Sequence, residues 1–312
     1  MRLFYCSFIA FILFASCDYN EDASIKLNEF QTISLMGDSL FIPKRSKEAN
    51  QILLMNLKEA ENQFKNDPSE KNYIWLGRRW AYVGDYRKAI SIYSDGLKKY
   101  PQSYRLHRHR GHRYVSLREF DLGIKDFKLA YDLMPKDKTE IEPDGIPNKL
   151  NQPLSNTQFN VMYHWGLAHY LKGEFDKALP IYKECMKYSV NNDLLIATSD
   201  WLYMTLMRLQ STEAATQLLS VITSNMEIVE NASYHKRLLM YKQELPIDSL
   251  FSTQDSDRQL SLITQGYGVA NWYLYNKDTT SAINLFKDIL KSPAWSPFGY
   301  IAAESDLASL SE

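Results

Sequence analysis

The most unusual group of chemically capable side chains is the run Arg105-Leu-His-Arg-His-Arg-Gly-His-Arg113. On a helix, one stripe would contain Arg105, Arg108 and His112, which are spaced at i, i+3 and i+7. The planar guanidinium group of arginine matches a carboxylate or a phosphate, so the stripe predicts binding of an acidic group. His109 and His112 could share a metal ion, but no third ligand is apparent. We therefore expect no metal site.

Signatures of common enzymes are absent from the sequence. It has no G-x-S-x-G elbow, P-loop, H-E-x-x-H or dinucleotide fingerprint. The net charge of −1, from 36 basic and 37 acidic residues, argues against a nucleic-acid partner. Cys185 lies late in a helical pattern, where a buried packing role is favoured over that of a nucleophile. We expect no cofactor, and a binding protein is favoured over an enzyme.

A repeated pattern indicates which elements hold these side chains. Five landmarks recur 34 residues later, by subtraction: Gly77, Trp80, Tyr86, Tyr93 and Pro101 return as Gly111, Tyr114, Phe120, Phe127 and Pro135. This pattern resembles the tetratricopeptide repeat, a helix–turn–helix unit. The resemblance implies an all-α, right-handed solenoid whose concave groove binds a peptide or protein. We expect Trp80 and Tyr114 to fill the space between paired helices.

About five such hairpins are expected, together with extra helices at the ends. The predicted repeats span about 70–103, 104–137, 159–192, 196–229 and 263–296, and the extra helices span 47–65, 228–244 and 298–310. The solenoid would therefore occupy residues 46–312, with no sheet. An insertion at about 138–158 contains Pro143, Gly145, Pro147 and Pro153, and so cannot be helical throughout. Loops of this size are usually functional or disordered.

The resemblance also implies which side chains face the groove. The first helix of each repeat would present Lys71, Ile74 and Arg78, then Arg105, Arg108 and His112, then Asn160, Tyr163 and Leu167. The groove is thus predicted to be basic and aromatic, with the candidate partner-binding residues Arg78, Arg105, Arg108, His112 and Tyr163. It resembles carboxylate-clamp repeats, which hold a peptide C-terminus, although the paired asparagines of the clamp are absent. The alternative is a solvated basic helix face.

Arg110 occupies a position where neighbouring repeats have Leu76 and Trp165. A buried guanidinium group needs a hydrogen-bonded partner of opposite charge. The insertion offers three candidate anchoring carboxylates, namely Glu140, Glu142 and Asp144. We expect residues 138–156 to fold over the groove and bring one of them to Arg108 or Arg110. Alternatively, Arg110 extends into solvent and the loop leaves the groove open.

The N-terminus resembles that of a bacterial lipoprotein. Residues 1–16 form the expected signal peptide, in which the apolar stretch Leu3–Ala15 is too short to span a bilayer. Ala15 and Ser16 precede Cys17, the expected site of lipidation, although Phe14 stands where leucine is usual. The alternative is an ordinary signal peptide. Residues 17–45 are predicted to be a tether, with Ile33–Ile42 packing in an extended conformation.

The runs Glu140–Asn148 and Tyr163–Gly173 are similar to bacterial tetratricopeptide-repeat proteins of uncharacterised function, which implies no activity. Our leading hypothesis is a lipid-anchored scaffold of the bacterial cell envelope, at the outer membrane or periplasmic face. It would bind a peptide or protein that carries acidic or C-terminal carboxylate groups. The alternatives are an enzyme with a pocket under the insertion, using His112 or Glu142 as acid or base, and a structural protein whose groove is self-occupied.

Overall fold

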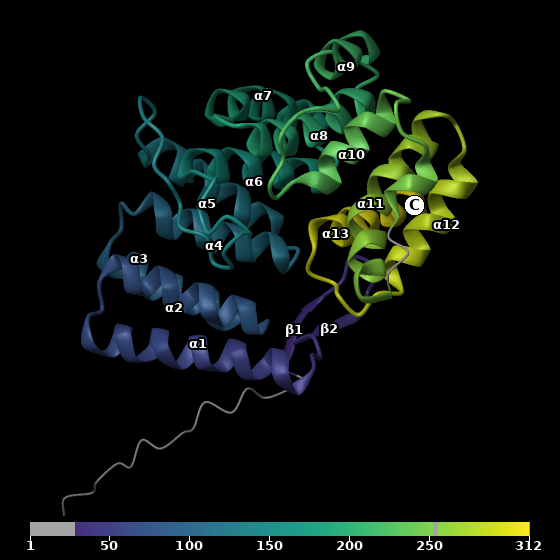
Figure 1. Ribbon diagram of the computed structural model, residues 1–312. Coiled ribbons are helices and arrows are strands. Elements are labelled where there is room, and N and C mark those ends of the chain that lie inside the picture. Colours follow the sequence, from purple (N-terminus) through teal and green to yellow (C-terminus); the bar gives the residue numbers. More distant parts are fainter. Residues whose placement is uncertain (1–28, 252–254, 312) are drawn as a thin grey trace, which may run out of the picture.

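The computed structural model describes residues 29–251 and 255–311, so the predicted signal peptide and Cys17 lie outside the described residues. Thirteen α-helices and one short strand pair occupy the described part of the chain (Figure 1). Ten helices form five hairpins: α2 (Glu70–Val83) with α3 (Tyr86–Lys99), α4 (Tyr104–Ser116) with α5 (Phe120–Leu133), α6 (Thr157–Leu171) with α7 (Phe175–Cys185), α8 (Asn192–Arg208) with α9 (Thr212–Leu219), and α11 (Asp255–Tyr275) with α12 (Thr279–Leu290).

Three further helices flank or interrupt this series: α1 (Lys47–Asn66), α10 (Ala232–Tyr241) and α13 (Phe298–Ser311). Short 3-10 turns follow α7 at Met186–Tyr188 and precede α11 at Ile247–Leu250. The predicted all-α series of helical hairpins is therefore confirmed. Among the described residues, no helix is both long and apolar enough to cross a membrane.

Side-chain caps explain where several helices begin. The carboxylate of Asp85 accepts the N–H of Lys88 at the start of α3, and the hydroxyl of Ser103 accepts the N–H of Leu106 at the start of α4. Asn156 caps α6 in the same way through the N–H of Phe159. Such caps satisfy N–H groups that have no partner within the helix. The cap of α4 therefore sets where the basic stripe begins.

Within each of the first three hairpins, an aromatic side chain of the second helix fills the space between the helices. Tyr93 and Phe127 are at most 1% exposed. A Cβ atom on Gly77 would lie 2.2 Å from Cε1 of Tyr93, and one on Gly111 would lie 3.0 Å from Cε1 of Phe127. Gly166 and Tyr182 repeat this contact. Only glycine lets the helices approach so closely.

Trp80 and Tyr114 do not have the role that the sequence predicted for them. Both are only half-buried, and Trp80 packs at the edge of the core. The prediction that they fill the space between paired helices was therefore wrong, because the second-helix aromatics already fill it.

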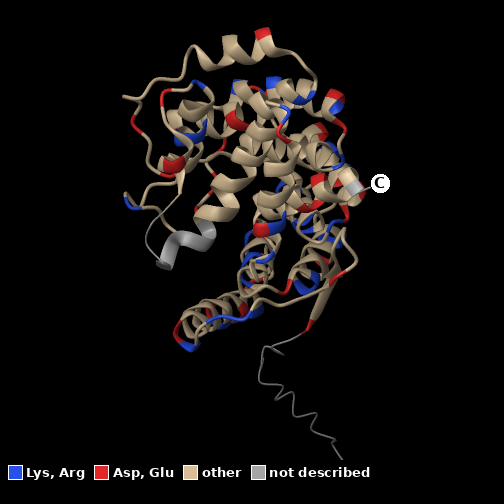
Figure 2. Ribbon diagram, turned by 90° about the vertical axis from the view of Figure 1, so that its right-hand side faces the viewer, with Lys and Arg blue, Asp and Glu red and all other residues tan. Residues whose placement is uncertain are grey.

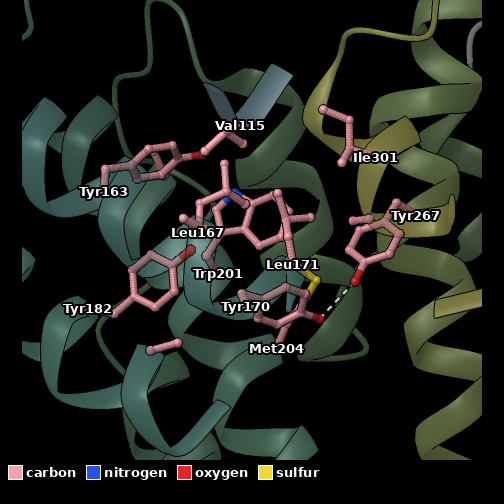
Figure 3. Packing of buried hydrophobic residues seen from close by; sticks show 14 of the residues in the cluster. Val115, Tyr163, Leu167, Tyr170, Leu171, Tyr182, Trp201, Met204, Tyr267 and Ile301 are labelled. Carbon is pink, nitrogen blue, oxygen red and sulfur yellow. Dashed lines mark hydrogen bonds between the residues drawn. The ribbon is translucent and has the colours of Figure 1, made fainter. Parts of the chain in front are cut away.

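The deepest part of the core lies where α6, α8 and α11 meet. Trp201 is 1% exposed and packs among Leu167, Leu171 and Tyr170 (Figure 3). Cys185 is fully buried, and its burial raises the pKa of the thiol to about 12, although hydrogen bonds from neighbouring hydroxyls oppose this. Because the thiolate is the reactive form, Cys185 has the packing role expected of it.

A two-stranded antiparallel hairpin, formed by β1 (Phe30–Ile33) and β2 (Ser39–Phe41), overlaps the segment 33–42 that was expected to pack in an extended conformation, although no sheet was predicted. It lies within the predicted tether, so the tether is folded from Phe30 onward. Gln31 is fully buried, and its side-chain oxygen accepts the N–H of Tyr86 at 2.9 Å. The hydroxyl of Thr32 donates to the carbonyl of Leu117 at 2.8 Å. The hairpin is thus bound to the turns of the first two repeats.

The same hairpin also contacts the C-terminal end of the solenoid. The N–H of Leu35 donates to Glu304 of α13 at 3.1 Å, and the indole N–H of Trp295 donates to the carbonyl of Phe41 at 2.7 Å. The hairpin therefore lies between the first repeats and α13 (Figure 1). Both ends of the repeat series are joined through it.

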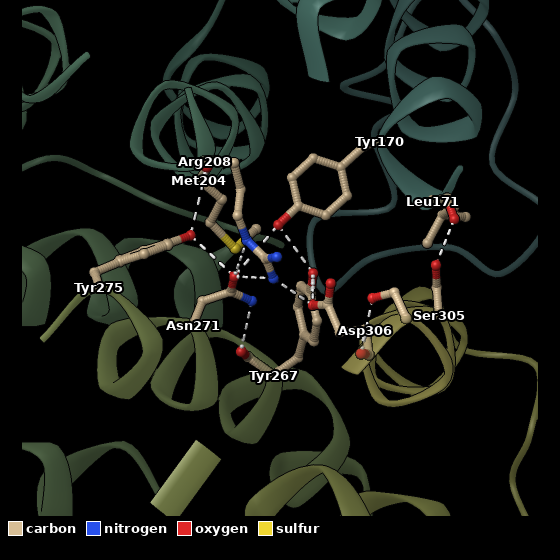
Figure 4. Close-up of polar contacts among 10 residues, drawn as sticks. Tyr170, Leu171, Met204, Arg208, Tyr267, Asn271, Tyr275, Ser305 and Asp306 are labelled. Carbon is tan, nitrogen blue, oxygen red and sulfur yellow. Dashed lines mark hydrogen bonds and ion pairs between the residues drawn. The ribbon is translucent and has the colours of Figure 1, made fainter. Parts of the chain in front are cut away.

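A buried polar network joins the last hairpin to the middle repeats (Figure 4). The hydroxyl of Tyr267 donates to Tyr170 at 2.9 Å and lies 3.0 Å from a carboxylate oxygen of Asp306. Arg208 forms an ion pair with Asp306 and donates to the side-chain oxygen of Asn271 at 2.7 and 2.9 Å. Helices α6, α8, α11 and α13 each contribute to this network, which uses its buried charges to hold the helices together.

Candidate functional site

The basic stripe on α4 is in contact with the insertion between α5 and α6. Arg105 binds both carboxylate oxygens of Glu140, at 2.7 Å from Nε and 2.6 Å from Nη2. Arg108 lies 2.9 Å from Glu142, and both of these side chains are nearly buried. The expected approach of an insertion carboxylate to Arg108 is therefore present. Each pair has the charge-assisted geometry in which arginine holds a carboxylate.

The backbone of the insertion continues across α2. Arg78 donates to the carbonyl of Pro143 at 2.9 Å, and Arg79 donates to the carbonyl of Gly145 at 3.3 Å. Gly145 lies so close to α2 that a Cβ atom there would be 1.5 Å from the hydroxyl oxygen of Tyr82. The absence of a side chain at Gly145 therefore allows the insertion to lie against α2.

The insertion is also held at its base. The N–H of Glu142 donates to the carbonyl of Ser155 at 3.0 Å, and Ile141 pairs with Asn156 as an isolated antiparallel bridge. The N–H of Glu140 donates to the side chain of Gln158 at 2.9 Å. The two arms of the insertion thus support each other, and the acidic arm lies along the groove.

Arg110 has a different partner from those predicted. It forms a two-point ion pair with Asp126 of α5, with Nε–Oδ2 and Nη2–Oδ1 distances of 2.7 and 2.8 Å. His107 lies 2.7 Å from the same carboxylate, and Asp126 is 2% exposed. The prediction that Arg110 anchors the insertion was therefore wrong. This arginine instead joins the two helices of its own repeat.

His112 lies against the chain's own C-terminal region. Its ring centroid is 4.3 Å from that of His164 and 5.2 Å from that of Phe298, the first residue of α13. Phe298 therefore packs against both α4 and α6, through His112 and His164. His112 is consequently less accessible to a partner than the sequence suggested.

Three histidines in this region are held neutral. Burial, together with the positive charges of Arg108 and Arg113, holds the pKa of His109, His112 and His164 well below its usual value. The Nδ1 atom of His109 lies 3.0 Å from Nη1 of Arg108, which is consistent with a neutral ring that accepts this hydrogen bond. The positive charge in this region therefore comes from arginines and lysines rather than from these histidines.

Two cavities lie beside the insertion. The smaller, of about 400 Å³, lies beside the stripe and includes Lys71, Arg105 and His109 in its lining. The larger, of about 600 Å³, extends toward the middle repeats and is open on one side. Its lining includes Arg78, Glu142, Asp144, Gly145, Lys149, Asn160, Tyr163, His164, Asn231, Tyr234 and Phe298.

Charges of both signs line the larger cavity, and basic and acidic residues are both spread over the helices (Figure 2). Burial raises the pKa of Asp144, an effect that neighbouring Arg78 opposes. Asn160 and Tyr163 add amide and aromatic surface, as expected for the third repeat. In the part of the chain that the structure describes, no group of three histidine, cysteine or acidic residues could hold a metal ion.

Of the five predicted partner-binding residues, Arg78 and Tyr163 line the larger cavity, whereas Arg105 lines the smaller one. Sequence reasoning missed Asn231, Tyr234 and Phe298. No repeat landmark marks these three residues, because they come from the N-terminal end of α10, with Asn231 as its cap, and from the start of α13. Within the insertion, Gly145 was the local sequence signal that the backbone could lie close to another element.

The helical hairpins, the 34-residue offset and the glycine–aromatic contacts give this chain the repeated helix–turn–helix architecture that its sequence predicted. No family model matches it. Over 135 residues, 43% of this chain, it is 26% identical to the BBSome complex member BBS4 of Bos taurus. That match spans 22% of the curated relative.

Solved structures with a similar arrangement include two tetratricopeptide-repeat proteins. One is YrrB, described as a TPR protein with an unusual peptide-binding site, at 12% identity and a TM-score of 0.41, covering 79% of this chain and 97% of that one. The other is a tetratricopeptide repeat protein from Parabacteroides merdae, at 11% identity and a TM-score of 0.46, covering 82% of this chain and 92% of that one.

Proposed function

We propose that this protein is a lipid-anchored scaffold of the bacterial cell envelope, at the outer membrane or periplasmic face. Its groove binds a peptide or protein segment that carries acidic or C-terminal carboxylate groups. The observation that carries the proposal is the two-point contact of Arg105 with Glu140, made by an extended acidic segment in the groove. The acidic segment of the insertion thus makes the same kind of carboxylate contact that we propose for the partner.

The contacts of the insertion leave capacity for a partner. The Nε atom of Arg108 is buried and has no hydrogen-bond partner among the described residues, so Glu142 does not satisfy this guanidinium group completely and a partner would reach it only if Glu142 moved. Arg105 remains about one-third exposed. A carboxylate from a partner could therefore replace Glu140 with little rearrangement of α4. The larger cavity, next to Arg78 and Tyr163, would then hold the adjoining side chains.

A structural role is the second candidate, and the same contacts favour it. If Glu140 and Glu142 never leave the arginines, the insertion completes the fold and the groove is permanently self-occupied. The enzyme hypothesis has less support, because Glu142 is paired with Arg108 and His112 packs on Phe298. Binding and self-occupancy differ in whether a second acidic segment can compete.

A synthetic peptide of residues 138–147 tests this competition. We expect the variant carrying Glu140→Gln and Glu142→Gln to bind the labelled peptide about tenfold more tightly than the unmodified protein, measured by fluorescence anisotropy, because the arginines lose their internal carboxylates. The control peptide carries glutamine in place of both glutamates. Adding Arg105→Gln and Arg108→Gln to the variant should abolish the gain.

Failure of the Glu140→Gln and Glu142→Gln variant to bind the acidic peptide better than the control peptide would rule out the binding proposal. Self-occupancy would then be the remaining interpretation. Circular dichroism of each variant verifies that the solenoid is still folded.

A further inference from the structure

The β1–β2 hairpin exposes an apolar surface, here called the hairpin patch. It consists of five large side chains that are 37–48% exposed: Phe30, Ile33, Leu35, Met36 and Phe41. All five fall within 12 consecutive residues, by the subtraction 41 − 30 + 1. Exposed apolar residues scattered singly need no explanation, but a contiguous group indicates an interaction site.

Strand register places the patch on one side of the hairpin. Phe30 pairs with Phe41, and their rings meet edge to face with centroids 6.1 Å apart. Ile33 pairs with Ser39, whereas Leu35 and Met36 lie in the connecting turn. The opposite side is the one bound to the solenoid.

An exposed apolar surface on the outer side of the hairpin is unexpected, because the inner side already packs against the solenoid. Gln31, Thr32 and Leu40 are buried against the repeats, so the hairpin has no need of a second apolar face for its own folding. A sheet covered on one side normally presents polar side chains to water on the other. Here two polar side chains, Gln31 and Thr32, are buried on the inner side, whereas five large apolar side chains are exposed. The outward face is therefore suited to a second apolar environment.

The position of the patch in the chain indicates which environment this is. Phe30 follows the proposed lipidation site, Cys17, by 13 residues, by subtraction. A chain of that length reaches at most about 45 Å. The anchor would therefore hold the patch close to the bilayer surface. Arg87, which is exposed, lies over the ring of Phe30 at 5.1 Å from its centroid, where its charge can meet lipid headgroups.

We propose that the hairpin patch docks on the lipid surface of the membrane that holds the anchor. This inference rests on the proposed lipid anchor. Apolar side chains at the tip and outer face would enter the headgroup region, and the hairpin would act as the second membrane contact that stable anchoring needs. Because the other side of the hairpin binds both the first repeats and α13, docking would also orient the solenoid relative to the bilayer.

Site-specific fluorescence in vesicles tests this docking. The full chain, processed in bacteria, is reconstituted into phosphatidylethanolamine–phosphatidylglycerol vesicles after Ile33→Cys or Met36→Cys substitution and labelling with a polarity-sensitive dye. Cys185 is fully buried and should not react. The control is Val221→Cys, which is 57% exposed and directly follows α9, a helix that lies far from the hairpin in Figure 1.

Brominated lipids should quench the dyes at residues 33 and 36 about threefold or more relative to the dye at residue 221, because only the patch enters the bilayer surface. Equal quenching at the three positions, with the protein still floating with the vesicles, would overturn the docking alone. Failure of the unsubstituted protein to float with the vesicles would overturn both the anchor and the docking. A concentration-dependent dye shift without quenching would show that a second copy covers the patch, and would also overturn the docking.

Discussion

Arg118 and Glu304 form a buried ion pair across 186 residues of sequence, with an Nε–Oε2 distance of 2.8 Å. Their side chains are 3% and 1% exposed. Arg118 also donates to the carbonyl of Ser116 at 2.6 Å and to that of Trp295 at 3.0 Å. The turn of the second repeat is thereby fixed to α13. This pair, together with the β1–β2 hairpin, joins the two ends of the solenoid.

The backbone at Arg118 shows how the second repeat was adapted to this contact. Its φ angle is +65°, in the left-handed region that favours glycine. The equivalent residues of the first and third repeats are Gly84 and Gly173, with φ angles of +99° and +74°. An arginine therefore stands in a glycine position, at a conformational cost of about 1 kcal/mol. The buried contacts of its guanidinium group offset this cost.

The first prediction concerns Glu304. Replacing it with glutamine leaves the guanidinium group of Arg118 buried without a counter-charge, which should lower the free energy of unfolding by about 3–5 kcal/mol. Urea denaturation followed by circular dichroism measures this loss. The control is Asp288→Asn, which breaks an exposed ion pair with Lys291 and should cost less than about 1 kcal/mol. Equal, small losses in both variants would contradict the assigned role of the buried pair.

The second prediction uses the backbone strain at Arg118. Arg118→Gly relieves the strain but leaves the carboxylate of Glu304 buried and unpaired, so it should destabilise the protein. Combining it with Glu304→Gln should cost less than the sum of the two single changes, by about 1–3 kcal/mol, because the two residues interact directly. The same denaturation experiment gives all four stabilities. Additive losses would show that the two side chains are not coupled.

The third prediction distinguishes the two sets of aromatic residues in the repeats. Phe127→Ala should cost about 3–5 kcal/mol, because Phe127 is fully buried against Gly111. Tyr114→Ala, at a half-buried position, should cost about 1 kcal/mol. Thermal or urea unfolding compares them. A larger loss for Tyr114→Ala would restore the original assignment of the core position.

Repeat periodicity was sufficient to predict the helical hairpins, because their packing partners lie in the same or the next repeat. Gly111, Phe127 and Pro135 therefore identified local structure correctly. The contacts made by Glu304 and Phe298 could not be found in this way, since they join segments far apart in the sequence and follow no period. Arg110 was misassigned for a related reason. Its partner, Asp126, lies on the next helix. From the sequence, however, the positive charge of Arg110 could equally well have paired with a carboxylate of the insertion.

The fourth prediction concerns pH. The folded-state pKa values of His109, His112 and His164 lie well below the unfolded value, mainly because of burial. Below about pH 6.5 the unfolded chain therefore binds more protons than the folded protein. The stability that these neutral histidines contribute is fully present above that pH and is lost as the pH decreases. Each histidine should contribute a slope of up to about 1.4 kcal/mol per pH unit.

Urea unfolding at several pH values between 7.5 and 5 measures this slope. His112→Phe keeps a ring against Phe298 while removing one titrating group. The slope of its unfolding free energy against pH should therefore be lower by up to about 1.4 kcal/mol per pH unit. A variant with the slope of the unmodified protein would show that His112 is not held neutral in the folded state.

The last prediction concerns the lipid anchor. The short apolar stretch before Ala15 and Ser16 indicates processing at Cys17, which lies outside the described residues. Cys17→Ala should either block processing or release most of the protein from the membrane fraction, because one surface contact such as the hairpin patch binds membranes only reversibly. Fractionation and mass measurement of the processed chain provide the readouts. The control is Cys6→Ala, which lies within the predicted signal peptide and should leave the mature protein unchanged. If the Cys17→Ala protein is processed and sediments with membranes as before, its attachment does not depend on a lipid at that residue.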